Sequence, residues 1–426
     1  MAIGRMRGKL QDSCYFEGIN KFLTALIALA VILNTNSIWT SVPGVGSSFV
    51  NLLYLILIIS ILGIIVLNFK KYEFNKLPNI LFLTVYFSIY LIYVFTTNYV
   101  SFSFGAKLLV AFLAFEMYFL KQKETGLPIL LKFYVNWIVV IGIISLFFWL
   151  FGSFLNIIQP SNFVFSKWAS FNGYPIAVPS YLNMYFITQY INGIPRNSAI
   201  FTEAPMAALN FLMAFSINTL LDLNKKMSKF KSVILFLCIL TTFSVTGYIG
   251  LIIIITYKFF SYRFKDKILN QIKVIMVIVL FFISVVLVNK IFTQKIGTES
   301  GNIRIDDYIA GYKAWKTHPI MGVGLVSTSV QQYMSMWRSY NLGYSNSLMD
   351  LLSHGGIYLF IPYVLAWLKS LIYSVRIKDY NLLIFTIIVL YLFSTTIFTN
   401  SFLIILIFVY LGNINLIQLR AESEER

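Results

Sequence analysis

Three groups of polar residues interrupt an otherwise apolar chain, and their side chains could handle an anionic substrate. The first group runs from Arg196 to Glu203. A guanidinium binds phosphate oxygens through paired donors, and a carboxylate at shallow membrane depth needs a polar cavity or a partner. The spacing corresponds to about two helical turns, so we expect both side chains on one helical face at the outer start of a membrane span. They would either bind substrate there or anchor the helix as an ion pair.

The second group opens a long loop, where apolar residues recur with helical spacing over 303–315. The pattern predicts an amphipathic helix along the membrane surface, ended by the proline that follows His318. Arg304 begins this helix, where it could reach a lipid phosphate or pair with Asp307 one turn away. His318 and Arg338, farther along the loop, are additional candidates for substrate binding.

The third group places Asn346, Asp350 and His354 at every fourth position. A helix carries such residues along one stripe, and polar groups at this depth usually face water or substrate. We assign Asn346 to substrate binding. Glu203, Asp350 and His354 are the candidates for a catalytic general base, although the last two could also simply satisfy each other.

Familiar motifs for nucleotide, dinucleotide or zinc chemistry are missing. The adjacent Asp306 and Asp307 fall on the predicted outer side, where nucleotide-sugars are not normally available. Cys14 and Cys238 are far apart, which indicates neither a disulfide framework nor a metal site. We therefore expect a protein that needs no metal and no cofactor.

The elements that must position these groups are membrane helices. Of the 426 residues, 58% are hydrophobic and only 12% are charged, against about 25% charged residues in soluble domains. Apolar runs of roughly 20 residues, enough to cross the hydrocarbon layer, recur along the chain. The net charge of +17 comes from short basic clusters between these runs. This arrangement is typical of cytoplasmic loops and argues against nucleic acid as a partner.

We predict an all-α polytopic membrane protein, folded as a single membrane domain over 1–426. Most of the 33 lysines and arginines fall on one side when both termini are placed in the cytoplasm, with the N-terminal stretch leading into a retained span. The twelve expected spans are 20–39, 48–68, 79–97, 104–120, 130–152, 198–221, 232–245, 247–262, 270–290, 347–371, 381–396 and 400–417.

Two expected extracytoplasmic segments, 153–197 and 291–346, are much longer than the other connections. Loops beyond about 15 residues are usually functional or disordered. Order is favoured by their aromatic residues, which suit sugar faces or the headgroup region: Trp168, Tyr174, Tyr181, Tyr185, Trp315, Tyr333 and Trp337.

Four sequence pieces in a fixed order resemble the bacterial polysaccharide polymerase and O-antigen ligase superfamily. They are "RNSAIFTEAP", "FSVTGYIGL", an arginine followed by "AWKTHPIMGVG", and "YSNSLMDLLSHGGI", within about residues 190–360. The resemblance implies a GT-C-like membrane-embedded glycosyltransferase fold and a donor glycan carried on undecaprenyl diphosphate. It also implies that two outer arginines, matched here by Arg196 and Arg304, engage the diphosphate.

The resemblance further implies a polymerase of O-antigen, capsule or exopolysaccharide in the bacterial inner membrane. Its partners would be the lipid-linked oligosaccharide and membrane lipids, with a chain-length regulator and a flippase as protein partners. The ligase branch usually has a histidine before the asparagine of the fourth piece, where this chain has Ser345. Ligase therefore stays an alternative. A flippase is another, although it should carry its cations inside a central cavity.

Overall fold

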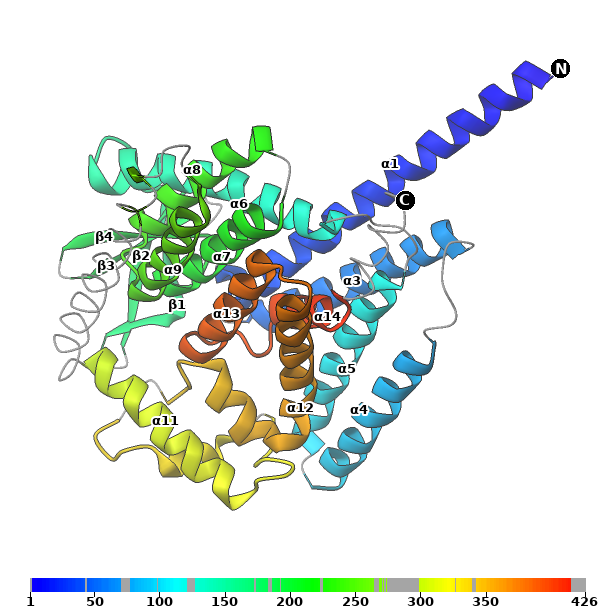
Figure 1. Cartoon of the computed structure of the whole chain (residues 1–426). Coiled ribbons are helices and arrows are strands. Elements are labelled where there is room, and N and C mark those ends of the chain that lie inside the picture. Colours follow the sequence, from blue (N-terminus) through cyan, green and yellow to red (C-terminus); the bar gives the residue numbers. More distant parts are fainter. Residues whose placement is uncertain are drawn as a thin grey trace.

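The computed structural model is a mostly helical bundle with a small sheet at one end (Figure 1). It describes residues 2–414 except 43, 70–76, 98, 121–126, 172–173, 183–185, 192, 223–224, 264–267, 270, 272, 274–298, 326 and 339–341. The predicted ninth span, 270–290, therefore lies almost wholly outside the described residues. Each of the other predicted spans coincides with a helix, although several boundaries differ.

The first half of the chain forms long apolar helices. Several of their large side chains point away from the protein; Val66, for instance, is 75% exposed. Such outward apolar groups are typical of a surface that faces lipid. The elements are α1 (Ala2–Asn34), α2 (Ile38–Ser41), α3 (Gly46–Asn68), α4 (Leu77–Thr97), α5 (Tyr99–Phe119), α6 (Ile129–Phe148) and the π-helical turn η3 (Trp149–Phe154).

The second half contributes the centre of the bundle. Every residue of Phe402–Leu411 is buried, as expected for a helix that is hydrophobic all round. The elements are α7 (Ala204–Ser216), the π-helical turn η4 (Ile217–Leu221), α8 (Lys225–Thr241), α9 (Val245–Ser261), α11 (Glu299–Thr317), the 3₁₀ turn η5 (Thr328–Tyr333), α12 (Ser347–Arg376), α13 (Tyr380–Thr395) and α14 (Phe402–Gly412).

Length and composition allow six helices of the described chain to cross a membrane. They begin at Phe16, Gly46, Phe102, Ile129, Ala204 and Ser347, and four shorter apolar helices accompany them. A polytopic membrane protein accounts for this set, because a soluble fold would leave too much apolar surface exposed. The number of twelve crossings stays a prediction.

The structure departs from the all-helical prediction between α6 and α7. An antiparallel sheet forms there, with strand order β1 (Asn162–Phe171), β2 (Tyr174–Tyr181), β3 (Phe186–Ile191) and β4 (Ile194–Ala199). The predicted sixth span consequently begins too early, because residues 196–199 pair with β3 and the helix starts at Ala204. Gly193, with φ of 77°, makes the tight turn between β3 and β4.

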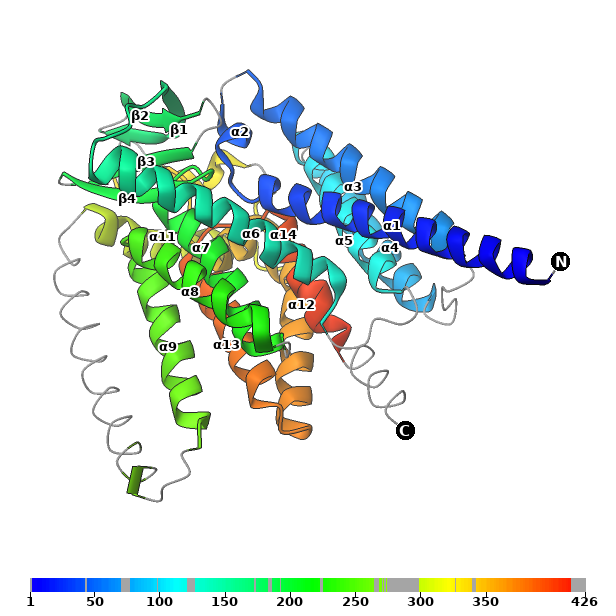
Figure 2. The ribbon, with the colours of Figure 1, turned by 90° about the horizontal axis from the view of Figure 1, so that it is seen from above.

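The sheet lies at the end of the bundle that is remote from the N-terminus (Figure 2). The turn after α1 joins this end, because the Ile38 amide donates to the Ile200 carbonyl at 2.9 Å and Ser37 bridges to Phe201. The chain thus ties its first helical hairpin to the segment that connects the sheet with α7.

The long helix α12 is broken at Gly356, whose φ of 64° is left-handed. The segment after α11 enters this break. The Val323 amide donates to the Ser353 carbonyl, and the Ile357 amide donates to the Pro319 carbonyl, both at 2.9 Å. Backbone groups that the break would leave unpaired are therefore satisfied by a loop from another part of the chain.

Candidate active site

Arg196 lies on the edge strand β4 and is half-buried. Its Nε donates a hydrogen bond to the Thr242 carbonyl at 2.9 Å, just beyond the end of α8. A helix C-terminus carries partial negative charge, so this position favours a cation. Burial lowers the pKa of the Arg196 guanidinium, while the nearby Glu203 acts to raise that pKa. The group stays protonated, because an arginine pKa starts far above neutral.

Glu203 occupies the N-cap position of α7 with an extended backbone, φ −156° and ψ 162°. Arg196 belongs to a strand, so the expected shared helical face is wrong. The two residues nevertheless come near each other, because the chain turns between β4 and α7. Burial raises the pKa of the Glu203 carboxyl, and the charges of Arg196 and Arg304 act in the opposite direction.

Arg304 lies in the first half of α11, and its Nη1 donates to the Thr395 carbonyl at 3.1 Å. Thr395 is the last residue of α13, so this arginine too is held at a helix C-terminus. The alternative pairing of Arg304 with Asp307 does not occur, since Asp307 bonds to Arg338.

Glu203 is therefore the point where two arginines from distant parts of the chain converge. Both Arg196 and Arg304 act electrostatically on its carboxyl. None of the hydrogen bonds or ion pairs found among the described residues uses the Glu203 side chain. We call Arg196, Glu203 and Arg304 the arginine–glutamate cluster. A cluster with two cations and one carboxylate has net positive charge for an anionic ligand.

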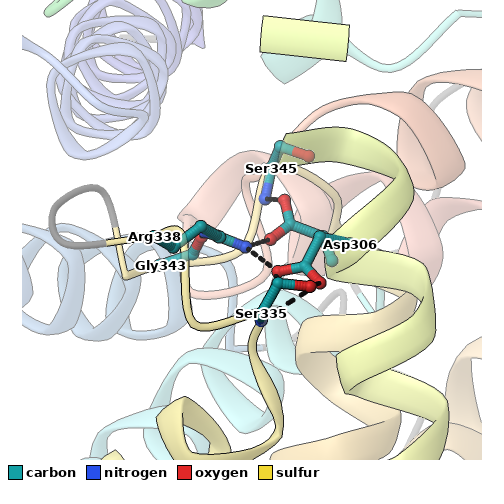
Figure 3. A network of polar contacts seen from close by, with 6 residues as sticks. Asp306, Ser335, Arg338, Gly343 and Ser345 are labelled. Carbon is teal, nitrogen blue, oxygen red and sulfur yellow. Dashed lines mark hydrogen bonds and ion pairs between the residues drawn. The ribbon is translucent and has the colours of Figure 1, made fainter. Parts of the chain in front are cut away.

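Arg338 belongs to a separate, buried network that also includes Asp306 and Asp307 (Figure 3). Its Nη1 lies 2.6 Å from Asp307 and 3.2 Å from Asp306. Ser335 donates to Asp306 through its hydroxyl at 2.6 Å, and the Ser345 amide donates to Asp307 at 2.8 Å. Burial acts to raise the pKa of the Asp306 carboxyl, but the donors of Ser335 and Arg338 hold that pKa below its ordinary value.

This network fastens the loop after α11 to that helix and to the start of α12. Only 6% of the Arg338 surface is exposed, and two carboxylates already neutralise its charge. The geometry therefore favours a structural role for Arg338. Its predicted contact with substrate stays a prediction.

The stripe predicted at the start of α12 is helical, with one change. Asn346 is the N-cap, and its side-chain oxygen accepts from the Met349 amide at 2.8 Å. His354 Nδ1 lies 2.9 Å from an Asp350 carboxylate oxygen, and His354 Nε2 lies 3.3 Å from the Ser327 carbonyl. Both ring nitrogens are thus engaged. This pair adjoins the Arg338 network through Tyr344, whose ring meets the imidazole edge-on at 5.6 Å.

His318 is the remaining candidate from the sequence. It follows the end of α11 at Thr317, as its proline neighbour predicts. Its side chain is exposed, and Nδ1 lies 3.0 Å from the Thr317 hydroxyl. The structure does not bring it into the arginine–glutamate cluster.

The sequence did not indicate the groups that orient the Arg196 and Arg304 side chains. Thr242 and Thr395 serve through their carbonyls, for which side-chain patterns carry no signal. Tyr248 and Tyr391 lie near Arg196 and Arg304 respectively. The signal for Tyr248 was its place in the "FSVTGYIGL" piece, which covers the turn between α8 and α9 and the start of α9. In the described part of the chain, no group of three or more His, Cys, Asp or Glu side chains could hold a metal ion.

Fold and site together define a polytopic membrane protein with a cationic, carboxylate-containing cluster at the end that carries the sheet. Residues 230–364 match the family model described as O-antigen ligase. The resemblance seen in the ordered motifs is thereby confirmed over this stretch, and the match supports membership of the O-antigen polymerase and ligase superfamily. A search of curated proteins finds no match. The matched stretch contains Arg304, Arg338 and the start of α12, whereas Arg196 and Glu203 precede it.

Proposed function

We propose that this protein is a glycosyltransferase that polymerises lipid-linked oligosaccharide repeats. The donor would be a growing glycan on undecaprenyl diphosphate, and the acceptor would be another lipid-linked repeat. The observation that carries the proposal is the convergence of Arg196 and Arg304 on Glu203. Membership of a superfamily of glycosyl-transfer enzymes in O-antigen pathways supports the same reaction class.

The proposed step is a displacement at the anomeric carbon of the donor sugar. An acceptor hydroxyl oxygen attacks that carbon, a new glycosidic bond forms, and the bond to the lipid diphosphate breaks. The diphosphate leaves with the bonding electrons and gains negative charge during the step. Guanidinium groups aimed at this charge stabilise the transition state more than the ground state. No metal is required, because the two arginines supply the positive charge.

Glu203 is the general base that the geometry supports best. The charges of both arginines act on its carboxylate, and no hydrogen bond among the described residues occupies it. Asp350 and His354 bond to each other, and His354 also meets the Ser327 carbonyl. General-base help contributes about 10²–10⁴ in rate, so the acceptor proton would pass to Glu203.

The reaction would take place on the extracytoplasmic side of the bacterial inner membrane. In this arrangement the sheet and α11 lie outside, the sheet extending to Ala199 just beyond the predicted outer segment 153–197 and α11 within 291–346, and both termini lie in the cytoplasm. Three side chains on one face of α11, Ile305, Ile309 and Tyr312, are apolar and exposed, which suits a helix lying on the lipid surface. A flippase would supply the repeats, and a chain-length regulator would be the expected protein partner.

A ligase is the second candidate, and the description of the matched family favours it. Such an enzyme would use the same donor and cluster but a different acceptor. Ser345 in this chain stands where the ligase branch usually carries a histidine, and its amide binds Asp307. That departure supports polymerase over ligase.

Purified protein in lipid vesicles, supplied only with lipid-linked repeats, tests the proposal. We expect a ladder of longer glycans that remain on the lipid. Arg196→Ala and Arg304→Ala should each slow formation of the ladder by roughly 10²–10³, by analogy with a lost oxyanion donor. Transfer that occurs only when a different acceptor is added would indicate a ligase. A ladder that is indifferent to both substitutions would contradict the assigned site.

Arg338→Ala serves as the contrasting variant. It leaves two buried carboxylates without their partner, a change that typically costs about 3–5 kcal/mol of stability. We expect this variant to lose folded protein, as measured by thermal unfolding in detergent. Arg196→Ala and Arg304→Ala should retain the wild-type melting temperature, because both side chains are only half-buried and hydrogen-bond to carbonyl groups.

A further inference from the structure

A cavity of about 330 Å³ opens between the sheet and the segment that follows α6. Its volume falls at the small end of the range of about 300–1,000 Å³ that is usual for sites of small ligands. The side chains that decide its chemistry are those of Asn156, Gln159, Phe163, Pro179, Tyr181 and Tyr190. The candidate reaction makes no use of any of them.

The floor of this cavity is a fixed polar cluster. The buried Tyr181 hydroxyl lies 2.9 Å from the Ser153 hydroxyl, which donates to the Thr188 hydroxyl at 2.7 Å. Gly152 is needed beneath the Tyr181 ring, because a Cβ there would come within 2.5 Å of ring atoms. The floor is therefore held in place before any ligand arrives, which reduces the entropy cost of binding.

The rim combines open aromatic rings with amide side chains. Phe163 is 57% exposed and Tyr190 is 46% exposed, so both rings can bury apolar surface against a ligand. Asn156 and Gln159 are also exposed and offer donors and acceptors on the same rim. A sugar ring presents C–H groups on its faces and hydroxyls around its edge. Aromatic faces attract such polarised C–H groups, and amides can bond the hydroxyls.

The cavity is lined by Tyr190 of β3, the strand that pairs with the one carrying Arg196. Gln189 pairs with Arg196 across β3 and β4, and its side-chain oxygen accepts from the Ala204 amide at 3.2 Å, next to Glu203. Tyr190 is the following residue of β3, so it points to the other face of the sheet, where the cavity lies. Neighbouring residues of β3 therefore connect the cavity with the side of the sheet that carries Arg196.

We propose that this cavity is a binding subsite for neutral sugar units of the glycan, several rings away from the reacting bond. The inference rests on the proposed function, because it takes the glycan of that reaction as the ligand. A subsite of this kind would hold the growing chain between transfers. It would therefore determine product length more than the rate of the first transfer.

Tyr190→Ala and the double variant Tyr190→Ala, Gln159→Ala test the subsite in vesicles with lipid-linked repeats. Two quantities would be measured: the yield of the first product, two repeats on one lipid, and the distribution of chain lengths. We expect the yield to stay within about twofold of wild type while the mean length falls severalfold. Tyr312→Ala, which removes a 54% exposed tyrosine from α11, is the matched control and should change neither.

A binding measurement separates this inference from the proposed function, because it requires no turnover. The probe is the oligosaccharide repeat released from its lipid diphosphate by mild acid. Saturation-transfer NMR with detergent-solubilised protein should show contact to sugar protons for wild type and Tyr312→Ala, and loss of that contact for Tyr190→Ala. If wild-type protein makes no first product but still shows the contact, only the proposed reaction fails.

The rival occupant is the lipid headgroup layer. If the rings on the rim merely contacted lipid, Tyr190→Ala would lower the yield or thermal stability of the inserted protein and leave chain length and sugar contact unchanged. That result would overturn the subsite. Unchanged length together with unchanged sugar contact in a stable Tyr190→Ala protein would overturn it equally.

Discussion

At the scale of single residues, the arginines differ in what surrounds them. Arg196 and Arg304 are half-buried and are held by single carbonyl groups at helix ends. Arg338 is buried between two carboxylates. Charge available to a substrate therefore resides on the first two. The neighbouring Glu203 carries an unusual carboxylate, because burial raises its pKa despite the adjacent cations.

The raised pKa of Glu203 predicts how transfer depends on pH. A general base must be ionised, so activity should be lost as pH falls through a pKa above the ordinary glutamate value of about 4.3. Glu203→Gln should lower the rate by roughly 10²–10⁴ and remove this acidic limb. The measurement is the initial rate of the first transfer from pH 4 to pH 8, conditions chosen to span about two units either side of pH 6.

His354→Gln is the control for this prediction, since the His354 imidazole belongs to the other candidate pair for the general base. It should retain the acidic limb. An acidic limb that persists in Glu203→Gln and disappears in His354→Gln would transfer the role of general base to the Asp350–His354 pair.

At the scale of elements, the break in α12 joins two sequence motifs. Gly356 has left-handed φ, and a Cβ there would overlap the Ile320 carbonyl oxygen and the Gly322 nitrogen. The loop after α11 therefore reaches the backbone of α12 only because Gly322 in the loop and Gly356 in the helix both lack a Cβ. This contact also fixes the position of Asp350 and His354, in the first part of α12, relative to the loop that holds Arg338.

Gly356→Ala tests this contact. A non-glycine residue in the left-handed region costs of the order of 1–3 kcal/mol, and the overlap with backbone atoms adds to that cost. We expect a clear fall in melting temperature, measured on purified protein in detergent. Gly343→Ala is the matched control, because a Cβ at Gly343 meets nothing within 4 Å. Equal melting temperatures for both variants would mean that the loop does not depend on the break.

At the scale of the whole molecule, the proposed reaction requires that the sheet and α11 lie on the extracytoplasmic side. The structure gathers Arg196, Glu203 and Arg304 into one cluster, so one side of the membrane must hold all three. The charge bias of the chain points to the outer side for this cluster.

Cysteine labelling in spheroplasts tests the orientation. The background would carry Cys14→Ser and Cys238→Ala, because Cys238 is buried. We expect a membrane-impermeant maleimide to label Lys313→Cys on α11 in intact spheroplasts, and to label Lys229→Cys on α8 only after permeabilisation. Both positions are exposed, so access decides the result. Protection of Lys313→Cys in intact spheroplasts would place the cluster in the cytoplasm and end the diphosphate proposal.

The membrane helices and the candidate arginines could be predicted from the sequence, because hydropathy and charge are local properties. Ala204–Leu221 and Ser347–Arg376 are apolar enough to be found without a fold. The helix around Arg304 follows from its spacing, and the ordered motifs indicated the superfamily. The sheet escaped prediction because its strands lie in one segment between long apolar helices, where only a loop was expected. Arg196 was therefore assigned to a helix although it lies on a strand.

What only the tertiary structure decided is which charges meet. Asp307 is one turn from Arg304 along the chain, yet it bonds to Arg338, because the loop after α11 folds back over that helix. Arg304 instead donates to the Thr395 carbonyl, and its charge acts on Glu203, which lies about a hundred residues earlier in the chain. Periodicity predicts which side chains are neighbours within one helix, whereas these ion pairs depend on distances between different elements. Those distances are set by packing, and no local pattern in the sequence encodes them.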